Sequence, residues 1–185
     1  MHIFIDRVKS LALAGFVGAF GGGFAISMAV AEETKQPEWG QVVVEDVDPS
    51  NYHDDRSTPL TLIAAYYNAI NRREYPRAYS YHPGGSLDSL RKGYEKTKSI
   101  RLALRNNADP DRRGGGTLYW YQPVAIEVMY MDGKKEVFGG CYKLDQPNPA
   151  YWWRPPFISI GIVSGSLTKS SRTLEESVPE SCDPA

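Results

Sequence analysis

Between Thr58 and His82 the chain reads TPLTLIAAYYNAINRREYPRAYSYH, and its apolar residues recur at helical spacing. Leu62, Tyr66 and Ile70 return every four residues and define one face of a helix. The run Asn71–Arg73 breaks this period before a second short helix begins. Two short helices with broad aromatic and aliphatic faces need a curved surface to cover, and this requirement limits the folds open to the chain.

Helix starts are marked by residues whose side chains can accept backbone hydrogen bonds. Either Ser57 or Thr58 can cap the first helix. Ser86 has the same role ahead of a third helix that ends near Lys96. The sequence therefore predicts three consecutive helices.

Beyond Lys96 the apolar period changes from about four residues to two, which indicates strands with one buried face. The predicted strands are Ile100–Arg105, Thr117–Met131, Glu136–Leu144 and Trp152–Leu167. Gln122 and Pro123 suggest a bulge or bend in the second of these strands, and Asp132-Gly133 predicts a tight hairpin turn after it.

Three helices followed by hairpin-connected strands predict an α+β fold. In this fold three N-terminal helices pack in a strongly curved antiparallel sheet of about four to five strands, and Val42–Val44 can add an edge strand. In the last strand, Ile158, Ile160 and Ile162 are expected on one face. A sheet bent over helices makes a cone, and the open mouth of such a cone commonly becomes a pocket.

Residues 1–31 have the organisation of a cleaved signal peptide. Arg7 and Lys9 precede the apolar run Leu11–Met28, and Ala29-Val30-Ala31 gives the small residues of a cleavage site. The alternative is an uncleaved membrane anchor, because the run is about long enough to span a bilayer. The remaining chain divides into a polar leader (32–57), the folded domain (58–167) and a polar tail (168–185), which we expect to be unable to order itself alone.

Composition limits the partners of the mature chain. The full chain has 185 residues, 21 basic and 22 acidic side chains, and residues 1–31 contain two of the former and one of the latter. The mature chain then carries 19 basic and 21 acidic residues, a net charge of −2. This near-neutral charge argues against binding to nucleic acid or, after cleavage of the signal peptide, to an anionic membrane surface.

The two cysteines, Cys141 and Cys182, favour a disulfide, because an exported protein matures in an oxidising compartment. The bond would tie the tail to the domain. The alternative is a buried free Cys141 and an unpaired Cys182.

Two other runs could suggest an ion or phosphate site. Asn51–Asp55 lacks further ligands at a recognised spacing and is interpreted as a solvated turn. The loop Ala108–Gly116 contains Arg112, Arg113 and three glycines but opens no helix, so we interpret it as a flexible hairpin tip. We expect no metal and no cofactor.

The runs AYYNAINRREYPRAYSYH, GYEKTKSIRLAL and FGGCYKL, in this order of elements, resemble the nuclear-transport-factor-2-like (SnoaL-like) superfamily. The likeness is to small exported bacterial members of unknown role and covers roughly Pro59–Leu167. It implies the cone-shaped fold described above. The superfamily contains isomerases, cyclases and dehydratases as well as non-enzymatic pocket proteins, so the resemblance alone selects no function.

The first functional hypothesis is an exported, non-enzymatic binding domain that takes a small apolar or sugar-like ligand. Aromatic side chains are expected to line its mouth, with one histidine beside them. The candidate pocket residues are Tyr66, Tyr79, His82, Trp120, Tyr142 and Trp153.

Two alternatives remain open. The run Trp152–Pro156 has the composition of an interface, which favours an envelope protein partner, and a homodimer through the sheet is a related arrangement. A small isomerase or dehydratase would need an acid or base, for which His82, Glu127 and Asp88 are the candidates. Glu127 has the opposite parity to the apolar residues of its strand and is expected to face water, and His82 is expected to end a helix with a satisfied ring.

Overall fold

The computed structural model describes residues 38–45, 47–106, 110, 116–150 and 155–182. They belong to one compact unit, residues 36–185. The predicted signal peptide lies outside the described residues. Within the described ranges, no helix has both the length and the apolar character needed to cross a membrane.

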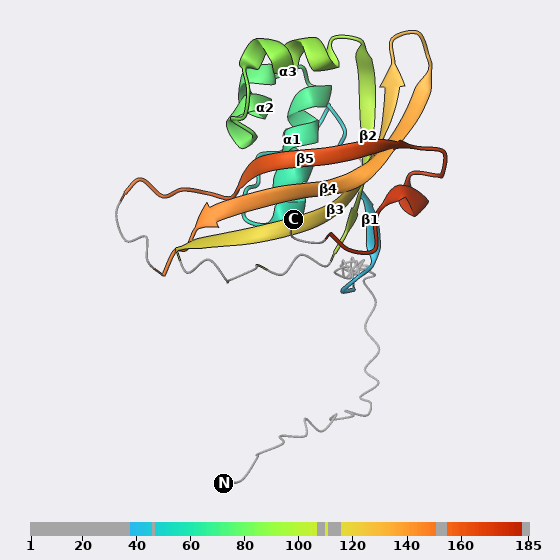
Figure 1. Ribbon diagram of the computed structural model, residues 1–185. Helices are drawn as coiled ribbons and strands as arrows, with labels where there is room; N and C mark the ends of the chain where they lie inside the picture. Colours follow the sequence, from blue (N-terminus) through green and yellow to red (C-terminus); the bar gives the residue numbers. More distant parts are fainter. Residues whose placement is uncertain (1–37, 46, 107–109, 111–115, 151–154, 183–185) are drawn as a thin grey trace, which may run out of the picture. The chain divides into compact units, whose positions relative to one another are not determined.

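In chain order, three helices follow the first strand and precede the second among the described residues (Figure 1). They are α1 (Pro59–Asn71), α2 (Tyr75–Tyr81) and α3 (Leu87–Tyr94). Thr58 caps α1: its hydroxyl accepts from Thr61 N at 3.2 Å, and the Thr61 hydroxyl accepts from Thr58 N. Ser86 caps α3 by accepting from Ser89 N at 3.1 Å, as the sequence predicted. The third helix ends at Tyr94 because Thr97 already belongs to the next strand.

The described strands form one antiparallel sheet in the order β1-β2-β3-β4-β5. They are β1 (Val42–Glu45), β2 (Thr97–Arg105), β3 (Thr117–Tyr130), β4 (Lys135–Pro147) and β5 (Gly161–Ser170). The fold is therefore α+β, and the edge strand predicted at Val42–Val44 is confirmed. The sheet is open, with β1 and β5 at its edges. Asp132-Gly133 turns the chain between β3 and β4, with Gly133 at φ 84°, where glycine is unstrained.

The strands differ from expectation at two places. The β3–β4 register runs without a shift from Thr117 to Met129, so of the bulge or bend expected at Gln122 and Pro123 the bulge is absent. The last strand begins at Gly161, well after the predicted Trp152, because β4 offers Gly161 its first partner at Asp145. Ile158 consequently lies before the strand and is 41% exposed, whereas Ile160 and Ile162 are buried.

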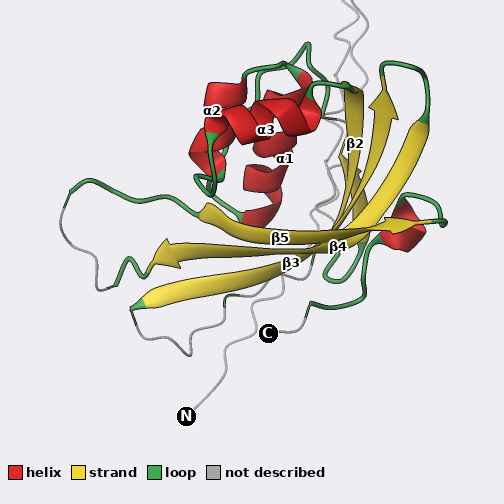
Figure 2. Ribbon diagram, turned by 45° about the horizontal axis from the view of Figure 1, so that its top comes forward, coloured by secondary structure: helices red, strands yellow, loops and turns green. Residues whose placement is uncertain are grey.

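The main core lies between the helices and one face of the sheet (Figure 2). Tyr67 and Leu62 of α1 are fully buried against the inward residues of the central strands. The inward set includes Leu102, Leu104, Val124, Ile126 and Leu144. Alternation within each strand leaves the intervening residues on the opposite face.

The C-terminal segment covers part of that opposite face. Leu174 and Val178, which flank the short 3-10 helix η1 (Glu175–Ser177), pack against Ala103 and Ala125. A Cβ added to Gly139 would lie 2.1 Å from the Ser177 carbonyl oxygen, so the segment passes directly over this glycine. Cys182 is bonded to Cys141. The predicted disulfide is confirmed. The disulfide and the buried side chains of Leu174 and Val178 together attach the C-terminal segment to the sheet.

Candidate functional site

Three of the predicted pocket residues, Tyr66, His82 and Tyr142, line one cavity of about 420 Å³. We call it the tyrosine cavity. It lies among α1, the α2–α3 connection, α3 and the paired strands β4 and β5. Its described walls consist of Tyr66, His82, Gly84, Ser86, Ser89, Leu90, Gly93, Tyr94, Tyr142, Gly165 and Leu167.

Two glycines make room for the rings of this cavity. Gly165 on β5 is the partner of Tyr142 on β4, and a Cβ there would lie 2.2 Å from the tyrosine ring. Gly84 lies against His82, where a Cβ would be 3.3 Å from the imidazole Cε1. Any larger residue at Gly165 would displace the Tyr142 ring, so this glycine sets the position of one cavity wall.

Four tyrosine hydroxyls lie together at this site: three belong to lining residues, and the fourth belongs to Tyr67, which is not part of the lining. The hydroxyls of Tyr67 and Tyr142 are 2.5 Å apart, and those of Tyr66 and Tyr94 are 3.4 Å apart. Tyr67 is fully buried, and Tyr66 and Tyr142 are nearly so. His82 packs edge-on to the Tyr66 ring, with 6.5 Å between ring centroids. These contacts join α1 and α3 to the sheet through polar groups inside an otherwise apolar core.

Burial raises the pKa of all four phenols above the usual value, because it disfavours the phenolate. The neighbouring Tyr94 and Tyr142 hydroxyls raise the pKa of Tyr66 further, and the same two neighbours act on Tyr67. In Tyr94 a hydrogen bond with Tyr66 opposes part of the rise. All four hydroxyls therefore keep their hydrogens at neutral pH.

This cluster predicts a steep loss of stability in alkali. The unfolded chain releases phenol protons near pH 10, whereas the folded chain retains these four to higher pH. The folded state then binds more protons, so the free energy of unfolding falls as the pH rises above about 10. Near-ultraviolet phenolate absorbance and circular dichroism, followed together, should show four phenols ionising only as the protein unfolds. Ionisation of every tyrosine near pH 10 with native circular dichroism would contradict this.

The other predicted pocket residues lie elsewhere. Trp120 lines a separate cavity of about 650 Å³ at the N-terminal end of α1, with Leu60 and Ile160. The Tyr79 hydroxyl donates to the carbonyls of Pro83 and Gly85 and so fastens the connection after α2. Trp153 lies outside the described residues.

The candidate acids and bases are also separated. The Glu127 carboxylate lies 3.3 Å from Lys135 Nζ and 3.6 Å from Arg101, on the sheet face opposite to the helices. Asp88 lines another cavity, with Arg73 and Arg91. Only His82 belongs to the tyrosine cavity. In the part of the chain that the structure describes, no group of three or more acidic, histidine or cysteine side chains is placed to hold a metal ion.

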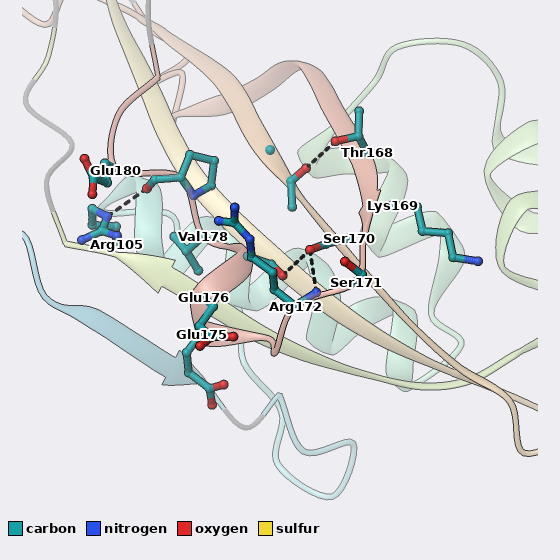
Figure 3. A pocket seen from close by; sticks show the side chains of 14 residues that line it. Arg105, Thr168, Lys169, Ser170, Ser171, Arg172, Glu175, Glu176, Val178 and Glu180 are labelled. Atoms are coloured by element: carbon teal, nitrogen blue, oxygen red, sulfur yellow. Dashed lines mark hydrogen bonds between the residues drawn. The ribbon is translucent and has the colours of Figure 1, made fainter.

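A larger cavity of about 1030 Å³ lies on the opposite face, between the end of β5 and the segment around η1 (Figure 3). Several of its polar side chains already have protein partners. Arg105 donates to the Pro179 carbonyl at 2.9 Å, and the hydroxyls of Ser170 and Ser177 are 2.8 Å apart. Lys169 is paired with Glu136 at 2.8 Å. We interpret this groove as the seat of the C-terminal segment and place the candidate site at the tyrosine cavity.

Sequence reasoning missed Tyr67, Tyr94 and Gly165 as parts of the site. Tyr94 falls on the apolar face of α3, where it reads as a core residue. Gly165 carries no local signal, since its importance depends on Tyr142 lying opposite in the next strand.

Comparisons with protein-family models, with curated proteins and with solved structures find no match for this chain.

Proposed function

We propose that this chain is an exported, non-enzymatic binding domain and that its ligand site is the tyrosine cavity. The observation that carries the proposal is the meeting of Tyr66, His82 and Tyr142 in one cavity of about 420 Å³. These residues come from three separate parts of the chain. Cavities of this size, with aromatic walls and a few convergent polar groups, are typical of small-molecule sites.

The arrangement of the elements supports the same proposal. Helices on one face of a bent antiparallel sheet fit the cone-shaped fold that the nuclear-transport-factor-2-like resemblance implies (Figure 1). We therefore propose the chain as a divergent member of that superfamily.

Export to an oxidising compartment, either periplasmic or extracellular, is part of the proposal. The bond between Cys141 and Cys182 supports it, because disulfides persist mainly in such compartments. The predicted signal peptide at residues 1–31 would direct the chain to that compartment.

We propose binding over catalysis because of the surroundings of His82. Its ring bonds the Ile162 carbonyl oxygen through Nδ1, at 2.9 Å, and no carboxylate occurs in the described walls of the cavity. A proton-transfer site normally joins its base to a second group that orients it or shares its proton.

The alternative of an envelope protein partner has one observation in its favour. Phe157 is 76% exposed and Val163 is 44% exposed, beside the open edge of the sheet at β5. The neighbouring residues Trp152–Arg154 lie outside the described ones. A partner held on this surface would leave the tyrosine cavity unoccupied. A variant with a filled cavity should therefore lose ligand binding but keep partner binding, which distinguishes the two functions.

The test of the proposed function is a cavity-filling variant, Gly93→Leu. Gly93 lines the cavity, and a Cβ there meets no atom within 4 Å. Leucine also favours a helix over glycine by about 0.5–1 kcal/mol, so the variant should fold at least as well as the wild type. A small-molecule fragment screen read by amide NMR should shift signals of the cavity residues in the wild type and should fail to do so in Gly93→Leu.

Lys92→Leu is the matched control, since it adds the same side chain to the same helix outside the cavity wall. It should bind as the wild type does. Fragments that shift only residues elsewhere, or that bind Gly93→Leu as well as the wild type, would refute the tyrosine cavity as the ligand site.

A further inference from the structure

The described walls of the tyrosine cavity offer uncharged polar groups only. Hydroxyls come from the tyrosines and from the α3 entrance, and one imidazole completes the set. These groups belong to Tyr66, Tyr94, Tyr142, Ser86, Ser89 and His82. Lysine, arginine, aspartate and glutamate are absent from the described lining.

His82 supplies a hydrogen-bond acceptor. The Ile162 carbonyl oxygen, 2.9 Å from Nδ1, can only accept, so Nδ1 carries the hydrogen in the neutral ring. The other ring nitrogen, Nε2, is then a bare acceptor. Among the described residues, no protein group donates to it. The cavity wall therefore contains a nitrogen that suits the hydroxyl hydrogen of a ligand.

Hydroxyl groups supply donors. The hydroxyls of Tyr142, Tyr67, Tyr94 and Tyr66 carry four hydrogens, and three are enough to join them, because Tyr94 bonds Tyr67 as well as Tyr66. One hydrogen of this cluster is left to bond a further acceptor. At the start of α3, the Ser86 hydroxyl donates to the Ser89 oxygen at 2.9 Å. The hydrogen of the Ser89 hydroxyl can therefore also bond a ligand acceptor.

The polar groups of the cavity lining also limit the charge that a ligand can carry. A charged group bound in this site would meet no opposite charge in the described lining and so would form no ion pair there. Asp88 and Arg91 of α3 line a different cavity. A purely apolar ligand would cover the hydroxyls and leave them unpaired, which is also unfavourable.

We propose that the tyrosine cavity binds an uncharged, hydroxyl-rich ligand of the sugar class. Such a ligand both donates and accepts at several positions, matching the imidazole nitrogen and the hydroxyl hydrogens together. This inference rests on the proposed function, because it specifies the ligand of the same cavity.

The test uses probes that share a pyranose ring and differ in charge. Neutral glucose, galactose and N-acetylglucosamine are titrated into the full mature chain by amide NMR. They are compared, at one and the same neutral pH, with the charged sugars glucuronate, galacturonate and glucosamine. Cyclohexanol serves as the weakly polar probe. At least one neutral sugar should shift the cavity residues and bind about ten-fold more tightly than its charged counterpart.

Tyr142→Phe should weaken the binding of that sugar by about five-fold, the effect of one net hydrogen bond. Tyr130→Phe is the matched control: its hydroxyl bonds Glu136 at the far end of the sheet, and binding should be unchanged. The amide spectrum of each variant reports that it is folded.

The inference fails if a charged ring or cyclohexanol binds as tightly as every neutral sugar, or if no sugar shifts the cavity residues. If the fragment screen then still places apolar or charged compounds in the cavity, the binding site stands and only its ligand class is wrong. If the screen is also negative, the proposed function fails as well.

Discussion

Replacing Cys141 and Cys182 together by serine is expected to lower the free energy of unfolding by about 4 kcal/mol. The bond joins residues 41 positions apart, and closing a loop of this length restricts the unfolded chain by roughly that amount. Urea denaturation of the double variant beside the oxidised wild type measures the difference. Because the serines are close in size to the cysteines, little of the loss should come from packing.

The folded state of this variant should also change locally. Without the bond, the C-terminal segment is held by Leu174, Val178 and the hydrogen bond from Arg105 to Pro179. Hydrogen exchange at Ser177 and Val178 should therefore accelerate more than exchange in the strand β3 beneath them.

Leu174→Ala in the disulfide-bonded chain is the companion variant. It removes an apolar anchor while the covalent tie remains, at an expected cost of about 2–3 kcal/mol. A double cysteine variant that loses less than 1 kcal/mol, with unchanged exchange at Val178, would show that the apolar contacts alone fix the segment.

The disulfide belongs to the part of this molecule that sequence could predict. Two cysteines leave only one pairing, and Thr58, Ser86 and Asp132-Gly133 each act on backbone within a few residues. The helices and the central strands follow from such local signals and from their apolar period. Local reasoning succeeded for the helix caps and for the hairpin turn, where the deciding partner lies nearby in the chain.

The candidate site depended on partners far apart. Trp120 and Tyr142 both point to the helix-covered side of the sheet, yet they line different cavities because they lie at different heights along paired strands. The Tyr142 ring fits only because Gly165 lies opposite it in β5. The alternation of apolar residues along a strand does not predict which residue of the next strand lies opposite. The last strand failed for a similar reason: Ile158 has the right alternation, but β4 gives no partner before Gly161.

The leader shows the same limit most clearly. Residues 32–57 were expected to be a polar leader in which only Val42–Val44 would form a strand. In the structure the described part of the leader is bound by several helix side chains, among them Asn71, which donates to the Val47 carbonyl at 2.8 Å. The fully buried Asn68 of α1 makes three hydrogen bonds to the leader. Its amide donates to the carbonyls of Asp48 and Asn51, at 2.8 and 2.7 Å, and its oxygen accepts from His53 N at 3.2 Å.

The same oxygen also accepts from Arg77 of α2 at 2.9 Å. Arg77 in turn donates to the His53 carbonyl and pairs with Glu74 at 2.6 Å. Asn68 thus uses both donors and both acceptor positions of its amide. A fully satisfied buried amide fixes one arrangement of the backbone around it.

Asn68→Ala is therefore expected to destabilise the protein by about 3 kcal/mol, since it leaves several partly buried backbone groups without partners. Thermal or urea unfolding measures the loss, and proteolysis should cut the chain between residues 47 and 57 sooner than in the wild type. Asn68→Asp should fall between alanine and the wild type: it keeps the acceptors for His53 N and Arg77 but loses both donors.

Asn51→Ala is the control within the leader itself, where the exposed side chain contributes little and the change should stay within about 0.5 kcal/mol. If Asn68→Ala costs less than 1 kcal/mol and leaves the proteolysis pattern unchanged, the strand pairing of β1 and the bonds from Asn71 and Arg77 are enough to hold the leader. With the expected loss, the leader is an integral part of the folded unit, and a chain cut at residue 58 would lack the partners that Asn68 requires.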